Sequence, residues 1–510
     1  MPEPIYGPPA DPQKLYSPGA DFPYLFRWLH WLLWPSLIVL TLTGLSEHAV
    51  SSPDWSLFSG VLPEYLWPGR VHLYHLWASL VFSPAVIAAL WIYVRTRDRY
   101  RLAHFLLLVG GVALVLSGLV LATWPGPPRV YVACRWVHAV AGLLVVPLAF
   151  LWHFLCGLSR YRRALIPAFR IWSRPKCLPV LGFVPLVLIT TCLILNGLPV
   201  TPPWRELTAK RIPVADVDTD ELETLSWNAA EPLKILLAGG IAFEDGCTEV
   251  TLRALHNGQE LFVCAEWLDP DEDRQYTPWE KTDDGWRHLI TNEDDESTYY
   301  EDKFSLVFPA AGDWQFERFG CAVYCHAGGG RAYGYKAADR MVDVWHWKST
   351  RTDPVGQVDD KYWSVADLSA KDIGRHGDPK QSGGYKKNVS QDKSHPAFLP
   401  DGPAAVKQGM ISADHAVEYS EEAAARIPAE TIVPGIVAAG AVGDRGDVAC
   451  TSRHEDGRWR VYVRRKLDTG SQYDVKFIPG QPYPFGCAAF DRSSKRHAYE
   501  YPVYRLMLEP

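Results

Sequence analysis

Apolar residues are concentrated in the first 200 positions of the chain, where they form long runs broken by short polar stretches. A helix needs about 20 such residues to cross a hydrocarbon core about 30 Å thick. Hydropathy predicts five spans of this kind, at residues 24–45, 71–94, 102–124, 132–155 and 178–200. We therefore expect a multi-domain membrane protein whose first part is a five-helix transmembrane bundle.

After position 200, apolar and polar residues alternate, which is the period of a half-buried strand. The segment TEVTLRALHNGQELFVCAEWLD alternates on either side of Asn257-Gly258, a typical hairpin turn. DKFSLVFP, RWRVYVRRKL and YRLML also predict strands, and the polar region 351–403 predicts a long surface excursion. The expected fold here is a mainly β-sandwich domain. The predicted domains are a tail at 1–22, the helical bundle at 23–200, a linker at 201–220 and the β-domain at 221–510.

The charge of the chain changes sign at the same boundary. Residues 1–200 contain 15 Lys+Arg against 7 Asp+Glu, and residues 201–510 contain 36 against 51. Basic residues cluster in two loops between predicted spans, at 95–101 and 160–176, which the positive-inside rule places in the cytoplasm. No secretory signal peptide opens the chain. We expect a bacterial inner-membrane protein with a cytoplasmic N-terminus and a periplasmic C-terminal domain.

Histidines lie inside the predicted spans, where ionisable side chains are costly and usually functional. His138 and His153 are fifteen residues apart, about 22 Å along a helix and about 60° around its axis. They can therefore face one side of the bundle at two depths. The predicted orientation places His30 at the depth of His153, and His72 or His75 at the depth of His138. Two stacked haems would need such pairs; hydrogen bonds to neighbouring helices are the alternative.

These spans resemble the di-haem cytochrome b subunits of membrane-bound hydrogenases and formate dehydrogenases. The shared features are RWLHW at the start of the first span, a histidine opening the second and two histidines in the fourth. The resemblance implies a haem b on the cytoplasmic side between His30 and His153. It implies a second haem b on the outer side between His75 and His138, with His72 as the alternative to His75. It also implies electron exchange with the membrane quinone pool.

The predicted outer domain contains the segment GCAVYCHAGGG, with Cys321, Cys325 and His326. Two thiols can add to the vinyl groups of a haem while the adjacent imidazole ligates the iron. The usual spacing is Cys-x-x-Cys-His, and this chain has one residue more between the cysteines. We expect a covalent haem c here. A disulfide between the two cysteines, or a metal site, is the alternative because the compartment is oxidising.

The domain around this segment resembles the haem-binding family of the ethylbenzene dehydrogenase gamma subunit, in the branch with a Cys-x-x-x-Cys-His form. The resemblance rests on EDKFSLVFP, GCAVYCH, VDVWHWKSTRTDPVGQVDD, YPFGCAAFD and RHAYE. In members with non-covalent haem, a methionine and a lysine are the ligands, at the positions filled here by His326 and His497. The resemblance therefore implies that His326 and His497 ligate the haem c. His346 and Met410 are alternatives to His497.

Two further features are open to more than one interpretation. The remaining cysteines of the outer domain could form disulfides: Cys247, Cys264, Cys450 and Cys487. The acidic run 269–302 is a solvated loop face or a surface that steers a basic electron carrier. No phosphate-binding glycine loop, Ser-His-Asp arrangement or nucleic-acid patch stands out.

The function predicted by these features is that of a three-haem membrane cytochrome. Two b haems and one c haem would pass electrons between the quinone pool and a periplasmic redox partner. Such a chain could itself oxidise quinol and reduce a cytochrome. The alternative is a non-catalytic membrane anchor and electron-transfer subunit of a larger respiratory complex. The two hypotheses differ in whether the purified chain alone transfers electrons from a quinol analogue to an external cytochrome.

Overall fold

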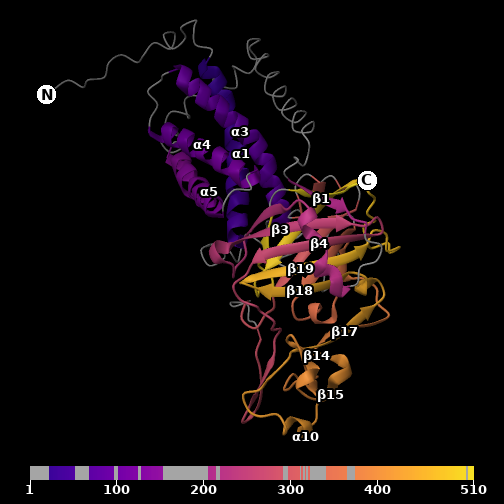
Figure 1. Ribbon diagram of the computed structural model, residues 1–510. Helices are drawn as coiled ribbons and strands as arrows, with labels where there is room; N and C mark the ends of the chain where they lie inside the picture. The colour runs from indigo at the N-terminus through magenta and orange to yellow at the C-terminus, as the bar shows by residue number, and fades with distance from the viewer. Residues whose placement is uncertain are drawn as a thin grey trace, which may run out of the picture. The chain divides into compact units, whose positions relative to one another are not determined.

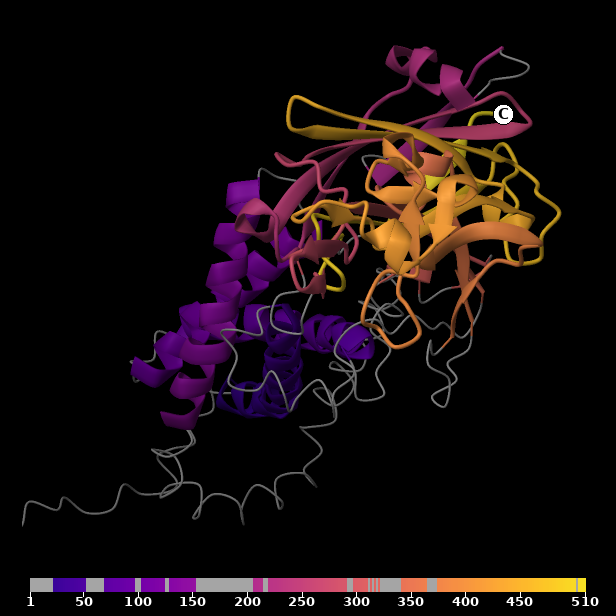
Figure 2. The same ribbon diagram turned by 90° about the horizontal axis from the view of Figure 1, so that it is seen from below.

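The structure is a computed structural model with two compact units, one mostly helical and one rich in strands. Helices form the indigo-to-purple part of the ribbon, and strands dominate its magenta-to-yellow part (Figures 1 and 2). The structure describes residues 22–51, 68–96, 102–123, 128–152, 205–213, 219–290, 297–310, 312–313, 316–317, 320–321, 341–364, 374–500 and 503–510.

The helical unit is built from long helices that share an apolar core. Leu37, Phe82, Leu114 and Val146 are buried together in it. Gly110 permits the closest helix contact, because a Cβ at this position would lie 2.5 Å from a methyl carbon of Val146. The helices are α1 (Phe22–Ser51), α3 (Pro68–Thr96), α4 (Leu102–Thr123) and α5 (Pro128–Val140), the last continuing through a π-helical turn (Ala141–Val145) to residue 152.

The prediction of a five-helix transmembrane bundle is wrong. Among the described residues, two helical stretches are long and apolar enough to cross a membrane, 74–91 in α3 and 133–152 in α5. The apolar stretches of α1 and α4, Leu32–Leu45 and Phe105–Leu121, are shorter. Fourteen residues of helix rise about 21 Å, well below the thickness of a hydrocarbon core. The fifth predicted span, 178–200, lies outside the described residues.

The strand-rich unit is a large β-domain built on one 13-stranded sheet, called the sandwich below, and the β-rich character that the alternating pattern predicts is confirmed. Its strands follow the order β10-β9-β8-β7-β20-β21-β2-β3-β4-β19-β18, and β1 joins β22 to β3. The two layers meet at a tryptophan core, where Trp267 of β4 stacks on Phe304 of β7 at 5.3 Å between ring centroids. The strands are β1 (Glu206–Arg211), β2 (Leu233–Ala238), β3 (Cys247–His256), β4 (Glu260–Leu268), β7 (Lys303–Pro309), β8 (Val342–Lys348), β9 (Asp359–Trp363), β10 (Arg375–Gly377), β18 (Ala449–Glu455), β19 (Arg458–Lys466), β20 (Pro482–Phe490), β21 (Ala498–Tyr499) and β22 (Tyr504–Leu508).

The hairpin predicted at Asn257-Gly258 is confirmed and joins β3 to β4. Gly258 has a φ of 89°, which suits glycine, and the Asn257 side chain accepts hydrogen bonds from the backbone N–H groups of Gln259 and Glu260. The predicted strands in DKFSLVFP, RWRVYVRRKL and YRLML are also confirmed, as β7, β19 and β22.

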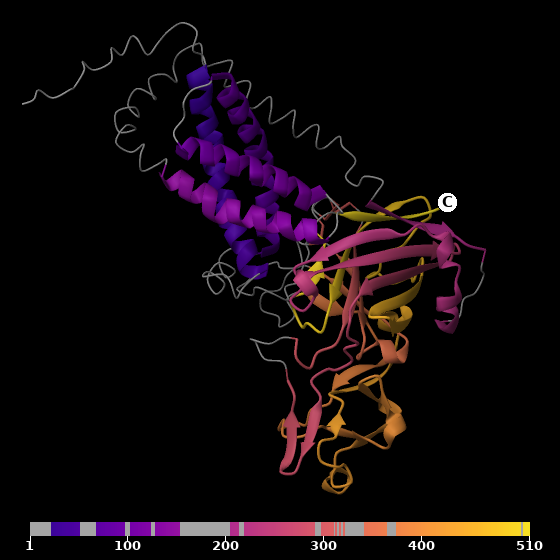
Figure 3. The same cartoon turned by 60° about the vertical axis from the view of Figure 1, so that its left-hand side comes forward.

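A smaller β-rich region extends from the sandwich (Figure 3). The β5–β6 hairpin pairs with β16, and Trp279 of β5 packs in a core with residues of the neighbouring segment. Its elements are β5 (Trp279–Thr282), β6 (Gly285–His288), β11 (Ser382–Lys387), β12 (Phe398–Pro400), β13 (Val406–Lys407), β14 (Met410–Ser412), β15 (Ala416–Glu418), α10 (Glu421–Ala424), β16 (Ile432–Val433) and β17 (Ile436–Val442). The region 351–403 is therefore not a surface excursion, because it supplies β9 to β12.

Candidate functional site

Two of the predicted haem ligands lie together in the helical unit. The rings of His75 on α3 and His138 on α5 are 6.1 Å apart between centroids, with their planes at 61°. A metal bonded to two opposed imidazoles holds their centroids about 6 Å apart, because each metal–nitrogen bond is about 2 Å long. The separation therefore fits one iron between the two rings.

Each of these imidazoles is held at Nδ1 by a hydroxyl group. Thr43 Oγ1 lies 2.8 Å from His75 Nδ1, and Ser117 Oγ lies 2.9 Å from His138 Nδ1. Both hydroxyls also donate to the carbonyl four residues earlier in their own helix, at 2.7 Å and 2.6 Å. Since a hydroxyl has one proton to give, each must accept from Nδ1–H. This arrangement fixes the tautomer with a lone pair on Nε2, the atom that can ligate a metal.

A glycine follows each hydroxyl residue and keeps space beside the imidazole. A Cβ at Gly44 would lie 3.6 Å from Cε1 of His75, and one at Gly118 would lie 3.1 Å from Cε1 of His138. Thr43-Gly44 on α1 and Ser117-Gly118 on α4 thus form the same arrangement. In each, a hydroxyl group orients the imidazole ring and the following glycine leaves space for it. The sequence reasoning missed both dipeptides; a hydroxyl followed by glycine inside an apolar run was the available signal.

The other predicted ligands of the helical unit cannot be placed in this way. His30 and His72 belong to α1 and α3, but their side chains are not among those described. His153 lies outside the described residues. The pairing of His30 with His153 and the choice between His72 and His75 stay predictions.

In the sandwich, His346 and His497 point away from the tryptophan core. His346 alternates on β8 with Trp345 and Trp347, which are core residues. His497 precedes Ala498, which is also in the core. Because successive strand residues face opposite sides, His346 lies on the outer face of the layer made by β8, β7, β20 and β21. His497 lies on the same face, since its ring is 4.5 Å from that of Phe490, which follows the core residue Ala489 on β20.

Cys321 lies on this same outer face. Its side chain is buried in a cluster with Val307 and Val344, which alternate with core residues on β7 and β8. Gly486 of β20 makes room for the thiol, because a Cβ there would lie 3.1 Å from Sγ. The thiol points toward Glu500 at 3.9 Å. Cys325 and His326 lie outside the described residues, so their part in a haem c site stays a prediction.

Phe490 contacts both histidines of the outer face. Its ring centroid is 5.5 Å from that of His346 and 4.5 Å from that of His497. His497 Nδ1 donates to the carbonyl of Lys495 at 2.9 Å, which again leaves the lone pair on Nε2. Met410 is buried on β14 in a different cluster, with Tyr276 and other residues, and the structure does not bring it together with Cys321.

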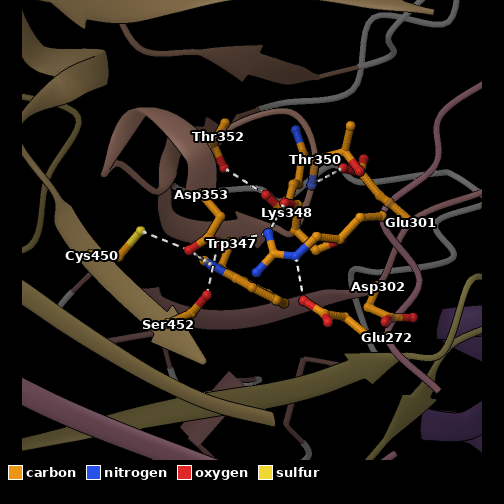
Figure 4. A network of polar contacts seen from close by, with 12 residues as sticks. Glu272, Glu301, Asp302, Trp347, Lys348, Thr350, Thr352, Asp353, Cys450 and Ser452 are labelled. Atoms are coloured by element: carbon orange, nitrogen blue, oxygen red, sulfur yellow. Dashed lines mark hydrogen bonds and ion pairs between the residues drawn. The ribbon is translucent and has the colours of Figure 1, made fainter. Parts of the chain in front are cut away.

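A buried polar network fixes the turn that follows β8 (Figure 4). Glu301 accepts the backbone N–H groups of Thr350 and Arg351 at 2.9 Å and 3.0 Å and pairs with the Arg351 guanidinium. Asp353 accepts from Nε1 of Trp347 at 2.8 Å and from the hydroxyl of Ser452 at 2.7 Å. These contacts hold β8, and with it His346, in one register.

Asp359 of β9 lies directly opposite His346 in the sheet. Burial would raise the pKa of its carboxyl, but Lys348, Lys361 and Arg445 reverse the effect and hold the pKa well below its usual value. Lys361 and Arg445 lie 3.0 Å and 2.7 Å from it. The outer face therefore carries an ionised carboxylate compensated by several cations.

Two predictions about other polar residues need correction. Cys264, Cys450 and Cys487 are buried free thiols in the structure, so they form no disulfide there, and a disulfide at Cys247 stays a prediction. The acidic run 269–302 does not form a solvated face throughout, because Asp269 and Asp302 at its ends are fully buried.

Comparisons with solved structures find weak similarity. A protein from Bacteroides uniformis described as carbohydrate-binding matches with a TM-score of 0.28 at 10% identity, covering 60% of this chain and 99% of the other. A family 9 carbohydrate binding module from Caldicellulosiruptor kristjanssonii matches in complex with cellotriose (TM-score 0.23, 11% identity) and with glucose (TM-score 0.24, 11% identity). These cover 60% of this chain and 93% and 95% of theirs. No curated protein matches.

The fold defines the class as a protein with a large β-domain and an N-terminal helical unit. A family model described as ethylbenzene dehydrogenase matches residues 224–501. This is more than half of the chain, and the chain therefore belongs to the ethylbenzene dehydrogenase family. The resemblance predicted for the C-terminal part is confirmed at this level. The resemblance of the N-terminal part to cytochrome b subunits stays a prediction.

Proposed function

We propose that the protein is a haem-binding electron-transfer protein. The observation that carries the proposal is the pair His75 and His138, whose rings are 6.1 Å apart and whose Nδ1 atoms are both held by hydroxyls. Paired imidazoles with fixed tautomers are the ligand set of a low-spin haem b. A bound haem would supply one-electron chemistry, while the chain would supply ligands, orientation and burial.

We propose a second cofactor on the outer face of the sandwich, a haem c attached at Cys321 and Cys325 with His326 and His497 as its ligands. The support is the Cys-x-x-x-Cys-His motif and the placement of Cys321 and His497 on one face. The Nδ1–H of His497 is committed to a backbone carbonyl, which orients the ring. His346, beside Phe490 on the same face, is the alternative sixth ligand.

We propose that the helical unit lies in the bacterial inner membrane and exchanges electrons with quinone, and that a periplasmic carrier or partner subunit is the other redox partner. Most exposed large apolar side chains of the described residues lie on the helices, among them Ile87, Leu116 and Trp152. Exposed apolar surface of this kind marks a lipid or protein contact. The segments 95–101 and 160–176 are rich in arginine, which by the positive-inside rule supports a cytoplasmic location for both segments.

The test is a pyridine haemochrome assay of the purified full chain beside its His138→Ala variant. We expect two haem b and one haem c in the wild type and a loss of one haem b in the variant, because Ala removes an axial ligand. His415→Ala is the matched control, because His415 is half exposed and far in sequence from every proposed ligand. Unchanged haem b content in His138→Ala would overturn the proposed pair.

Membership of the ethylbenzene dehydrogenase family favours a second candidate, an electron-transfer subunit of a larger complex. The two candidates differ in what the chain does alone. If the purified chain, mixed with a quinol analogue and an external cytochrome, gives no cytochrome reduction while its haems can be reduced chemically, the subunit role is favoured. Turnover by the chain alone favours the enzyme.

A further inference from the structure

Five aspartates from distant parts of the sequence converge at one end of the sandwich. The carboxylates of Asp343, Asp360 and Asp474 offer oxygen atoms that all lie within 4.8 Å of one another. Asp343 is on β8 and Asp360 on β9, both on the inner face of the layer, while Asp474 follows β19. Asp378 and Asp447 lie near enough for the charge of Asp474 to raise the pKa of both carboxyls, although burial is the larger cause.

One oxygen of each of the three central carboxylates is anchored. Asp343 Oδ2 accepts from the N–H of Val475 at 2.9 Å, and Asp360 Oδ1 accepts from the N–H of Lys361 at 3.0 Å. Asp474 Oδ2 pairs with the Arg465 guanidinium at 2.9 Å. The second oxygen of each carboxylate has no hydrogen-bond partner among the described residues.

Further unpartnered oxygens surround these. Both oxygens of Asp378 and Oδ1 of Asp447 lack a hydrogen-bond partner in the part of the chain that the structure describes, which brings the total there to six oxygens from five carboxylates. Asp343 and Asp360 are fully buried, and Asp378 is 2% exposed. Buried acceptors without partners are rare in folded proteins, because each has lost its water without a replacement.

The charge of the cluster is also unbalanced. Of the described basic side chains, Arg465 forms the ion pairs with it, 2.9 Å from Asp474 and 3.4 Å from Asp343. One guanidinium cannot neutralise five carboxylates, and like charges this close cannot all remain ionised without a further positive charge.

We propose that Asp343, Asp360, Asp378, Asp447 and Asp474 form a calcium site. Six unpartnered oxygens match the six to eight oxygen ligands that Ca²⁺ takes, and carboxylates are its usual ligands in proteins. Mg²⁺ fits less well, because it keeps several waters and rarely occupies a site made wholly of carboxylates. The anchored oxygens act as a second layer that orients the ligating ones.

A second acidic cluster, Asp269 with Asp302 and Asp491, does not meet this description. Asp302 accepts three N–H donors, from Asp273, Arg492 and the Trp459 indole, so both of its oxygens are already engaged. The calcium proposal is confined to the first cluster.

The calcium ion would tie the paired strands β8 and β9 to the segments that follow β10, η11 (Asp444–Gly446) and β19. β8 carries His346 on its opposite face, so the ion would brace the strand on which this candidate ligand lies.

The test is metal analysis and thermal unfolding of the purified full chain. After treatment with a chelator and dialysis, CaCl₂ is expected to bind at one ion per chain by calorimetric titration. It should raise Tm by about 5–10 °C when free Ca²⁺ exceeds Kd about 100-fold. MgCl₂ at the same concentration should raise it less. No calcium binding and no change of Tm in wild-type chain would overturn the proposal.

The variants Asp360→Asn and Asp378→Asn distinguish a bound calcium ion from protons shared between the carboxylates. Asp284→Asn, at an exposed position, is the control. With a calcium site, both cluster variants lose calcium binding and have a Tm that no longer responds to chelator. If protons hold the cluster instead, removing a buried charge raises Tm and chelator has no effect on any variant, which overturns the proposal. The wild-type titration decides the matter even where a variant fails to fold.

Discussion

At the scale of single residues, Thr43 and Ser117 decide which nitrogen of a paired imidazole carries the proton. Each hydroxyl gives its own proton to a helix carbonyl, so the imidazole must donate from Nδ1. The function of His75 and His138 as proposed ligands depends on this, because a ring with its proton on Nε2 offers no lone pair there.

Removal of either hydroxyl is expected to weaken the proposed haem b. Thr43→Val and Ser117→Ala keep the histidines but leave Nδ1–H without its acceptor, and loss of such a partner typically costs 10–100-fold in affinity of a metal site, about 1.4–2.7 kcal/mol. Haem retention against a haem-scavenging protein measures the effect. Ser79→Ala is the control, since the Ser79 hydroxyl donates to the Leu76 carbonyl and serves no histidine. Equal retention in all three variants would contradict the role assigned to the hydroxyls.

Burial of Asp269 makes the stability of the protein depend on pH. Burial, with a smaller effect from the charge of Asp302, raises the pKa of Asp269 to about 9. Burial also raises the pKa of Asp302 well above its usual value, although the N–H donors that engage both of its oxygens oppose the rise. The folded chain therefore keeps a proton on Asp269 at neutral pH, where the unfolded chain releases it.

Asp269→Asn is expected to stabilise the protein at neutral and mildly alkaline pH. The ordinary pKa of 3.8 applies to the unfolded state and about 9 to the folded state, so wild-type stability falls as pH rises through this window. The variant does not titrate and should gain about 1–3 kcal/mol at pH 8 relative to wild type, and nothing near pH 4. Urea unfolding at both pH values measures the difference. The same difference at both values would show that the proton is not its source.

At the scale of elements, three neighbouring strands present one surface to the proposed haem c. β8, β7 and β20 carry His346, Val307 and Gly486 outward, and Cys321 packs on them. Strand alternation places these residues on one face, while hydrogen-bonded register sets them side by side. Cys321 can therefore lie close to the sheet because Gly486 has no side chain.

Gly486→Ala tests this close approach. The added Cβ would lie 2.7 Å from Val307 Cγ2 and 2.9 Å from Cys321 Cβ, so the cysteine has to move. We expect about 1–3 kcal/mol of destabilisation by overpacking, together with a smaller fraction of chains that carry covalent haem in intact-mass spectra. Gly402→Ala is the control, because a Cβ there meets nothing within 4 Å. Wild-type mass and stability in Gly486→Ala would contradict the assigned contact.

At the scale of the whole molecule, the two units differ in how far their large apolar side chains are exposed. The sandwich buries its large aromatic residues, as in the contact of Trp267 with Trp347. The helices leave many large apolar residues exposed, including Tyr74, Trp77 and Leu148. This contrast supports a lipid environment for the helical unit and a watery one for the sandwich.

Protease accessibility tests the proposed arrangement across the membrane. Protease added to intact spheroplasts is expected to digest the sandwich domain, because the proposed orientation has this domain on the periplasmic side. In inside-out vesicles the same domain should be protected until detergent is added. Protection in spheroplasts and digestion in the vesicles would contradict the proposed orientation.

The sequence alone determined the elements whose signal is local. The hairpin of β3 and β4 and the strands β7, β19 and β22 follow from alternation and from Asn257-Gly258, because strand period and turn chemistry depend on neighbouring residues. The prediction of a five-span bundle is wrong because the apolar stretches of α1 and α4 are too short to cross a hydrocarbon core, a length that mean hydropathy alone does not reveal.

Only the tertiary structure decided which polar residues are buried and with which partners. Asp360, in a stretch that composition assigns to the surface, is fully buried beside Asp343 and Asp474. His75 meets Thr43 across two helices, 32 residues apart in the chain. The sequence determines the face of an element on which a residue lies, because that depends on the local period. It does not determine what lies opposite, because the free energy of a buried charge or imidazole depends on contacts made by segments far away in the chain.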